Sequence, residues 1–140
     1  MNDVKENVIN QLCRFKILKA IEQTKQYLGV TNSFLDTCSY CIARCILQDI
    51  ISIQHKEKYQ NDIVQNFYKK YKDTRDFHAH YGESTKTEQS LSLKELEPVI
   101  IELHKIVDNK LNCYYIYSED SILTNLLVNT FLPVIKAKKG

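Results

Sequence analysis

The sequence of 140 residues is poor in the two residues that most often interrupt regular secondary structure, with only 3 glycines and 2 prolines. Sandwiches and barrels need many tight turns, and glycine and proline supply much of the chemistry of those turns. This scarcity disfavours a turn-rich β architecture and predicts long helices instead. A chain of this length is expected to form a single domain, residues 1–140.

An excess of charge of one sign and a long apolar run are also missing. The 19 basic and 17 acidic side chains leave a formal net charge of +2, so no global field indicates a nucleic-acid or membrane partner. No apolar run approaches the roughly 20 residues that cross a bilayer, and the first residues lack the basic and apolar regions of a secretory signal. We therefore expect a cytoplasmic protein with no membrane partner.

The 5 cysteines are an odd number in a chain without an export signal, which favours free thiols over a disulfide framework. Cys38, Cys41 and Cys45 are spaced three and four residues apart, so they share one face of the expected helix. Because aliphatic residues surround them, we interpret all three as small fillers buried at a helix crossing. A metal site is the alternative, but such sites usually draw their cysteines from loops and need a fourth ligand.

The spacing of apolar residues predicts a bundle of four or five helices, and thus an all-α fold class. The expected helices cover 4–28, about 34–56, 61 to about 80, 92 to about 117, and 122 to about 135. Gly29 supplies a stop after the first helix. Ser92 and Glu95 have the form of a capping box at the start of the fourth. Residues 82–90 have no apolar residue and are expected to form an exposed loop.

Titratable side chains are concentrated in YKDTRDFHAHYGES, residues 71–84. Each residue of a regular helix advances by about 100°, so Arg75 and His78 lie on nearly the same face, whereas Arg75 and His80 diverge by about 140°. Asp76 precedes His80 by four residues, where its carboxylate can accept an imidazole N–H. For Arg75 and His80 to meet at one substrate, either the helix distorts at its end or a second copy of the chain brings its own motif alongside.

Arginine can hold a phosphate through two parallel hydrogen bonds, and histidine can exchange protons near neutral pH. Together they suit phosphodiester cleavage without a metal. Lysines precede the motif and alternate with tyrosines whose rings could stack on exposed bases. These residues are Tyr68, Lys69, Lys70, Tyr71 and Lys72. A solvated lysine-rich helix face without a ligand is the alternative.

The segment from Arg75 to His80, RDFHAH, is similar to the Arg-x4-His signature of HEPN domains, in which a polar residue commonly follows the arginine, as Asp76 does here. The resemblance covers the motif closely and the rest of the chain in outline. It implies a homodimer in which the motifs of both protomers face each other and form one metal-independent ribonuclease site, without a cofactor. In one toxin branch of the family a tyrosine follows the histidine after one residue. Here Tyr81 follows directly and Gly82 takes that place, so this branch is not indicated.

The resemblance also implies roles for individual residues. His80 would act as general acid or base on the ribose 2′-OH and the leaving oxygen, and Arg75 would hold the scissile phosphate. Asp76 would orient His80. The substrate-binding candidates are His78, Tyr81, Lys72, Lys70 and Tyr71. The expected function is that of a toxin or phage-defence effector acting on RNA, with an antitoxin or a nucleotidyltransferase as a candidate partner.

Three other interpretations stay open at this point. The first is a non-catalytic helical dimer module that binds RNA, a nucleotide or a protein partner. The second is a metal site of His78 and His80 with His104 or a cysteine. It requires a non-helical backbone, because residues two apart on a helix point about 200° from each other. The third is a surface helix end with incidental histidines.

Overall fold

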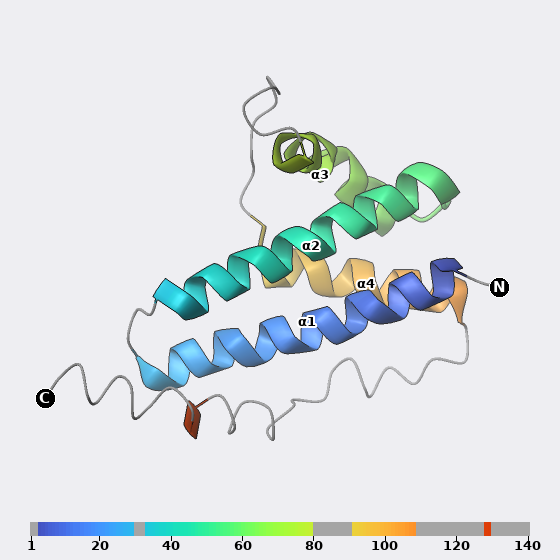
Figure 1. Cartoon of the computed structure of the whole chain (residues 1–140). Coiled ribbons are helices and arrows are strands. Elements are labelled where there is room, and N and C mark those ends of the chain that lie inside the picture. The colour runs from blue at the N-terminus through green and yellow to red at the C-terminus, as the bar shows by residue number, and fades with distance from the viewer. Residues whose placement is uncertain (1–2, 30–32, 80–90, 109–127, 130–140) are drawn as a thin grey trace, which may run out of the picture.

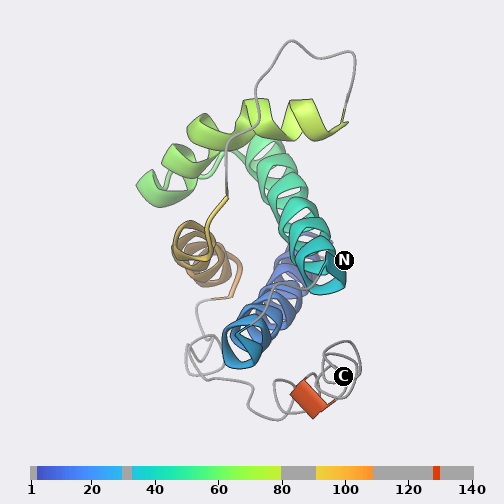
Figure 2. The ribbon, with the colours of Figure 1, turned by 90° about the vertical axis from the view of Figure 1, so that its left-hand side faces the viewer.

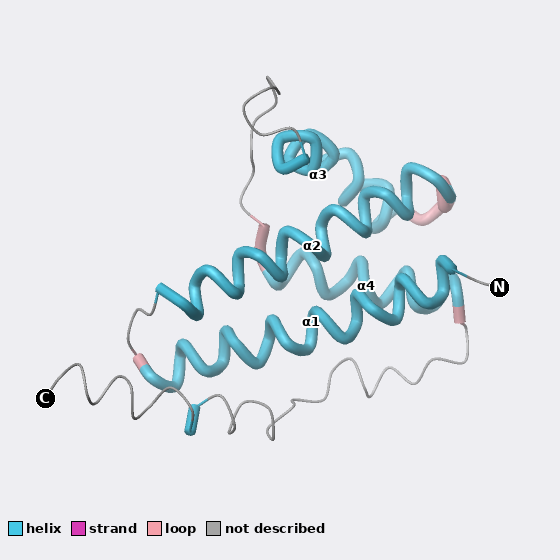
Figure 3. The backbone as a smooth tube through the Cα atoms, in the orientation of Figure 1, coloured by secondary structure: helices cyan, strands magenta, loops and turns pink. Residues whose placement is uncertain are grey.

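The structure is a computed structural model that describes residues 3–29, 33–79, 91–108 and 128–129. Within these residues it forms four α-helices and no strand (Figures 1 and 3). The helices are α1 (Asp3–Leu28), α2 (Ser33–Glu57), α3 (Asp62–Ala79) and α4 (Leu93–Val107). The predicted all-α fold class is confirmed, and the predicted bounds of the first three helices are correct to within one residue.

Each helix packs against two others. The chain turns back after α1, so α1 and α2 run antiparallel and side by side (Figure 1), and α4 also packs against α1. Figure 2 shows α3 crossing the end of α2, where it contacts both α2 and α4. This arrangement leaves the C-terminal half of α3, where the Arg-x4-His motif begins, beside the start of α4.

The apolar residues that recur every three or four positions meet in one core. Burial of each large apolar side chain contributes about 1.5–3 kcal/mol relative to exposure. The core residues of α1 include Val8, Leu12, Phe15 and Leu18; those of α2, Ile46, Leu47, Ile50 and Ile51; those of α3, Val64, Phe67 and Tyr71; and those of α4, Leu96, Val99, Ile100 and Leu103. The amphipathic pattern therefore positions all four helices.

Local features define the end of α1 and the start of α3. Gly29 ends α1 with a φ of +63°, a left-handed conformation that glycine adopts without strain. The side chain of Asn61 begins α3, since its Oδ1 accepts hydrogen bonds from the backbone N–H groups of Ile63 and Val64 at 3.0 and 3.1 Å. Its Nδ2 also donates to Glu102 at 3.1 Å, which fixes the start of α3 to α4.

Two predictions about the fourth helix are wrong. Ser92 lies at its N-cap but makes no side-chain capping hydrogen bond, so the expected capping box does not form. The helix ends at Val107 rather than near Tyr117, because Asp108 takes an extended conformation with a φ of −151°. Asp108 also forms an ion pair with Lys5 of α1 at 3.4 Å. Aspartate favours helix ends over helix interiors, in keeping with its place directly after α4.

The prediction that the cysteines of the second helix are buried is also wrong. They share one face of α2, as their spacing requires, but Cys41 and Cys45 are exposed and Cys38 is partly buried. The inward face of α2 belongs instead to larger side chains such as Ile46, Leu47 and Ile50, which remove more apolar area from water. The described cysteines, Cys13, Cys38, Cys41 and Cys45, are free thiols.

Two predicted segments fall outside the described residues. They are the exposed loop at 82–90 and most of the last helix at 122–135, of which only Val128 and Asn129 are described, both as helical. In the described residues, no helix has both the length and the apolar character that a bilayer crossing demands.

Candidate functional site

The Arg-x4-His motif begins near the end of α3 and continues beyond it. Arg75 lies in the helix and is partly buried, and its Nε atom is enclosed by protein. Asp76 and His78 follow in the last turn of α3. His80 and Tyr81 lie outside the described residues. The meeting of Arg75 and His80 at one substrate therefore stays a prediction.

One turn before Arg75, a single carboxylate ties α3 to α4. Oε2 of Glu95 accepts a hydrogen bond from the Tyr71 hydroxyl at 2.6 Å and another from the Lys70 ammonium at 2.8 Å. The Lys70 and Tyr71 hydrogen bonds favour the charged carboxylate and lower the pKa of Glu95. Burial of Tyr71, together with the neighbouring Glu95 charge, raises the pKa of the phenol. The Tyr71 phenol is therefore a neutral donor and the Glu95 carboxylate an ionised acceptor, and a hydrogen bond of this type is strong.

This tie anchors the backbone that carries Arg75. The Tyr71 side chain is fully buried, and its ring packs against Phe67 with the ring centroids 4.7 Å apart. Thr74, the residue before Arg75, is also buried. Because Thr74 is buried directly before Arg75, α3 packs against the core as far as the residue that carries the guanidinium group.

Two of the predicted substrate-binding residues, Tyr71 and Lys70, make contacts with other residues of the protein. The ring of Tyr71 is buried and has no face to offer an RNA base, so the stacking role predicted for it is wrong in this structure. Lys70 is exposed, but its ammonium is hydrogen-bonded to Glu95 and lies 5.3 Å from the centroid of the Tyr71 ring. Lys69 and Lys72 are exposed and Tyr68 is partly buried. These three residues form the basic surface of α3.

Glu95 helps to hold α3 in place at the candidate site, a role that the sequence did not predict. Its position three residues after Ser92 predicted that it caps its own helix, whereas its carboxylate accepts hydrogen bonds from Lys70 and Tyr71 of α3. The partners are 24 and 25 residues away in the chain, beyond the reach of any periodic pattern.

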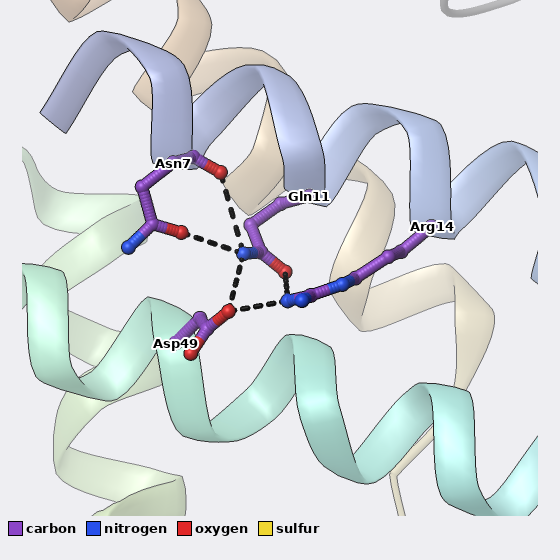
Figure 4. Close-up of polar contacts among 4 residues, drawn as sticks. All are labelled: Asn7, Gln11, Arg14 and Asp49. Carbon is purple, nitrogen blue, oxygen red and sulfur yellow. Dashed lines mark hydrogen bonds and ion pairs between the residues drawn. The ribbon is translucent and has the colours of Figure 1, made fainter. Parts of the chain in front are cut away.

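A second polar cluster joins α1 to α2 (Figure 4). Asp49 accepts hydrogen bonds from the Gln11 amide at 2.8 Å and from the Arg14 guanidinium. Gln11 is fully buried, and its amide nitrogen also lies 2.8 Å from Oδ1 of Asn7. Since these groups satisfy one another, we interpret the cluster as structural: it sets the register of α1 against α2.

His104, a ligand in the alternative metal site, is buried on α4, the helix that packs against α1. Burial lowers the pKa of its imidazole, although the Asp108 carboxylate and the backbone of Val8 act in the opposite direction. Within the described ranges, no group of three or more histidine, cysteine, aspartate or glutamate side chains could hold a metal ion. The side chains of His78 and His80, on which the metal alternative depends, lie outside the described part of the chain, so this alternative stays a prediction.

The described part of the site combines one anchored arginine with an exposed basic surface on the same helix. Arg75 is three residues beyond Lys72, which places the two side chains on neighbouring turns of one helix face. Guanidinium and ammonium groups in such a row suit a chain of phosphates better than a single small anion. Comparisons of the chain with protein-family models, curated protein sequences and solved structures gave no match.

Proposed function

We propose that the protein is a metal-independent endoribonuclease of HEPN type, which acts as a toxin or phage-defence effector on RNA. Its site is composite: Arg75 and His80 from two protomers face each other across a dimer interface. The observation that supports the proposal most directly is the position of Arg75. Arg75 lies in α3, one turn after the contact between Tyr71 and Glu95, on an anchored backbone and near exposed lysines.

The reaction needs only proton transfer and charge stabilisation. His80 of one protomer removes the proton of the ribose 2′-OH while that oxygen attacks the adjacent phosphorus, and His80 of the other protomer protonates the leaving 5′-oxygen. Arg75 pairs with the non-bridging oxygens and stabilises the charge that develops on them. The bond from phosphorus to the 5′-oxygen breaks as the bond to the 2′-oxygen forms. The products are a 2′,3′-cyclic phosphate and a 5′-hydroxyl.

Two structural features support this mechanism. Lys69 and Lys72 present positive charge to solvent along α3 and can pair with successive phosphates of an RNA strand that reaches Arg75. Large apolar side chains are also exposed on the two helices expected to form the dimer interface: Phe34 and Tyr40 on α2 and Ile63 on α3. Phe34 and Tyr40 lie near the start of α2 and Ile63 lies beyond its end, so a second copy that covers either group would remove that group from water and gain stability from its burial.

The decisive experiment is cleavage of a mixed single-stranded and structured RNA by the purified protein in excess EDTA. Wild type, His80→Ala, Arg75→Ala and a control, Lys94→Ala at an exposed position of α4, are compared. We expect wild type and the control to cut and to leave cyclic-phosphate ends, and the two motif variants to lose cutting by at least about a hundredfold. His80→Ala should still bind RNA.

Other outcomes distinguish the competing functions. If wild type binds RNA but never cuts it, the protein is a non-catalytic binding module. If EDTA abolishes cutting and an added divalent cation restores it, the metal-independent mechanism is wrong.

A further inference from the structure

A pocket of about 280 Å³ lies between the end of α2 and the first turns of α3, at the opposite end of α3 from the motif. Its chemistry is distinctive. Two lysines, a histidine, a tyrosine and glutamine amides line it, and the described lining contains no carboxylate. The residues used below are His55, Lys58, Gln60, Gln65, Tyr68 and Lys69. This surface therefore offers positive charge, hydrogen-bonding amides and an aromatic ring to one small ligand.

The turn that forms one wall of the pocket is held in place. Gln54 is buried, and its amide makes two hydrogen bonds with the backbone of Tyr59: Nε2 donates to the carbonyl and Oε1 accepts from the N–H, both at 3.1 Å. The N–H of Lys58 donates to the Gln54 carbonyl at 2.8 Å. Lys58 has a φ of +53°, which is uncommon for a residue with a side chain. The contacts of Gln54 with its neighbours maintain this conformation.

The opposite wall is formed by side chains of α3 and the last turn of α2. The Tyr68 hydroxyl lies 3.1 Å from Nδ1 of His55, a contact that orients the phenol ring. Gln65 donates to the side-chain oxygen of Gln60 at 3.4 Å, so two amides lie together at the rim. Amides of this kind can donate to and accept from the edge of a base, and a tyrosine ring can stack on its face.

We propose that this pocket binds one nucleotide unit, with its phosphate between Lys58 and Lys69 and its base against Tyr68, Gln60 and Gln65. The volume is near the lower limit of ligand pockets, which span roughly 300–1,000 Å³, and so suits one nucleotide rather than several. A free mononucleotide and a unit of single-stranded RNA share this chemistry. The choice of RNA rests on the proposed function.

The pocket and the motif lie on one continuous face of α3. Tyr68, Lys72 and Arg75 follow at steps of four and three residues, so they are neighbours along the helix. Lys69 precedes Arg75 by six residues, or about 9 Å along the helix axis at 1.5 Å per residue, and lies about 120° from it around the helix, with Lys72 between them. An RNA strand seated in the pocket would pass Lys72 on its way to Arg75. The pocket would thus set the position of the strand relative to the scissile phosphate.

The test measures binding in the His80→Ala background, in which RNA stays intact whether or not wild type cuts it. A fluorescent single-stranded RNA is titrated by anisotropy at several salt concentrations into this protein, into Lys58→Ala/Lys69→Ala, and into the charge-matched control Lys94→Ala/Lys105→Ala. Each lost phosphate contact lowers the slope of log K against log salt by about 0.7 for single strands. Because both lysines hold the same phosphate, we expect the pocket variant to lower the slope by about 0.7 and the affinity at low salt by about tenfold or more. The control should change neither.

NMR spectra of the side-chain amide groups of the same protein show whether the ligand binds in the pocket. RNA should shift the side-chain NH₂ signals of Gln60 and Gln65, and Tyr68→Leu should remove these shifts while the protein keeps its fold. Unchanged RNA affinity and slope in the pocket variant would overturn the proposal and leave the cleavage mechanism standing. Adenosine monophosphate that shifts these signals while RNA does not would overturn the choice of RNA. Pocket binding of RNA without cleavage by wild type would support the pocket and refute the ribonuclease.

Discussion

The Tyr71 hydroxyl donates a 2.6 Å hydrogen bond to Glu95, and this contact joins α3 to α4 through residues that lie on either side of the Arg-x4-His motif in the chain. Tyr71 is buried and belongs to the core, whereas the Glu95 carboxylate also reaches the surface, where it meets Lys70. The helix that presents Arg75 is therefore held by a polar contact as well as by apolar packing.

Replacement of Tyr71 by phenylalanine tests this tie. Tyr71→Phe keeps the ring but removes a hydrogen bond to a charged group, which is worth about 1.5–3 kcal/mol. Because Lys70 still pairs with Glu95, we expect a loss near the lower end, about 1–2 kcal/mol, in urea unfolding followed by circular dichroism. Tyr27→Phe, at an exposed tyrosine, should stay within about 0.5 kcal/mol of wild type. Equal stabilities of the two variants would contradict the tie.

The buried imidazole of His104 predicts a loss of stability on acidification. Its pKa is lowered in the folded protein, so the unfolded chain takes up a proton first as the pH falls through 6.5, the ordinary value for histidine. His104 thus contributes stability above that pH and loses it progressively below. In His104→Leu, the free energy of unfolding should fall less between pH 7.5 and 5 than in wild type. Parallel curves for wild type and His104→Leu would refute this assignment.

The cluster that joins α1 to α2 predicts an order of effects. Asp49→Ala leaves the buried Gln11 amide without one of its acceptors, and we expect a cost of about 1–3 kcal/mol. Arg14→Ala should cost less, about 1 kcal/mol or below, because both side chains of its ion pair with Asp49 are partly exposed to solvent. Urea unfolding of both variants measures this order. A larger cost for Arg14→Ala would mean that the ion pair, and not the buried amide, stabilises the contact.

The composite site predicts complementation between two inactive variants. A mixed dimer of Arg75→Ala and His80→Ala keeps one intact arginine and one intact histidine, whereas each homodimer lacks both copies of one of them. Mixing the two proteins should therefore restore part of the cleavage in EDTA. Native mass spectrometry provides the control, since it shows whether subunits of 16.4 kDa have exchanged. Exchanged dimers without any restored activity would argue against a shared site.

Local signals were sufficient to predict most of the helices. Apolar residues at three- and four-residue spacing and the stop at Gly29 act within one or two turns of the chain, and the bounds of α1, α2 and α3 follow from them. The early end of α4 at Asp108 was missed because neither glycine nor proline follows Val107 to mark it in the sequence. Spacing also shows which residues share a face but not which face turns inward. For this reason the cysteine face of α2 was assigned to the core.

The candidate site, like the helices, was predictable where it depends on local sequence and not where it depends on contacts between helices. The pattern from Arg75 to His80 is local and visible in the sequence. The role of Glu95 is not, because its partners lie on another helix. Tyr71 was assigned to the surface on the basis of its lysine neighbours, yet its place in the apolar repeat with Val64 and Phe67 indicated the core. Where charge pattern and apolar periodicity disagree about an aromatic residue, the larger burial energy decides.

The outward thiols of α2 bear directly on how a dimer of this protein is recognised. Cys41 and Cys45 face solvent on the same helix, so two molecules that collide along it under oxidising conditions can be joined by a disulfide. Such a covalent pair has the mass of a dimer but holds the chains together through α2, whatever the orientation of the two motifs. Only a dimer that persists in a reducing agent, or after both cysteines are replaced by serine, bears on a site shared between protomers.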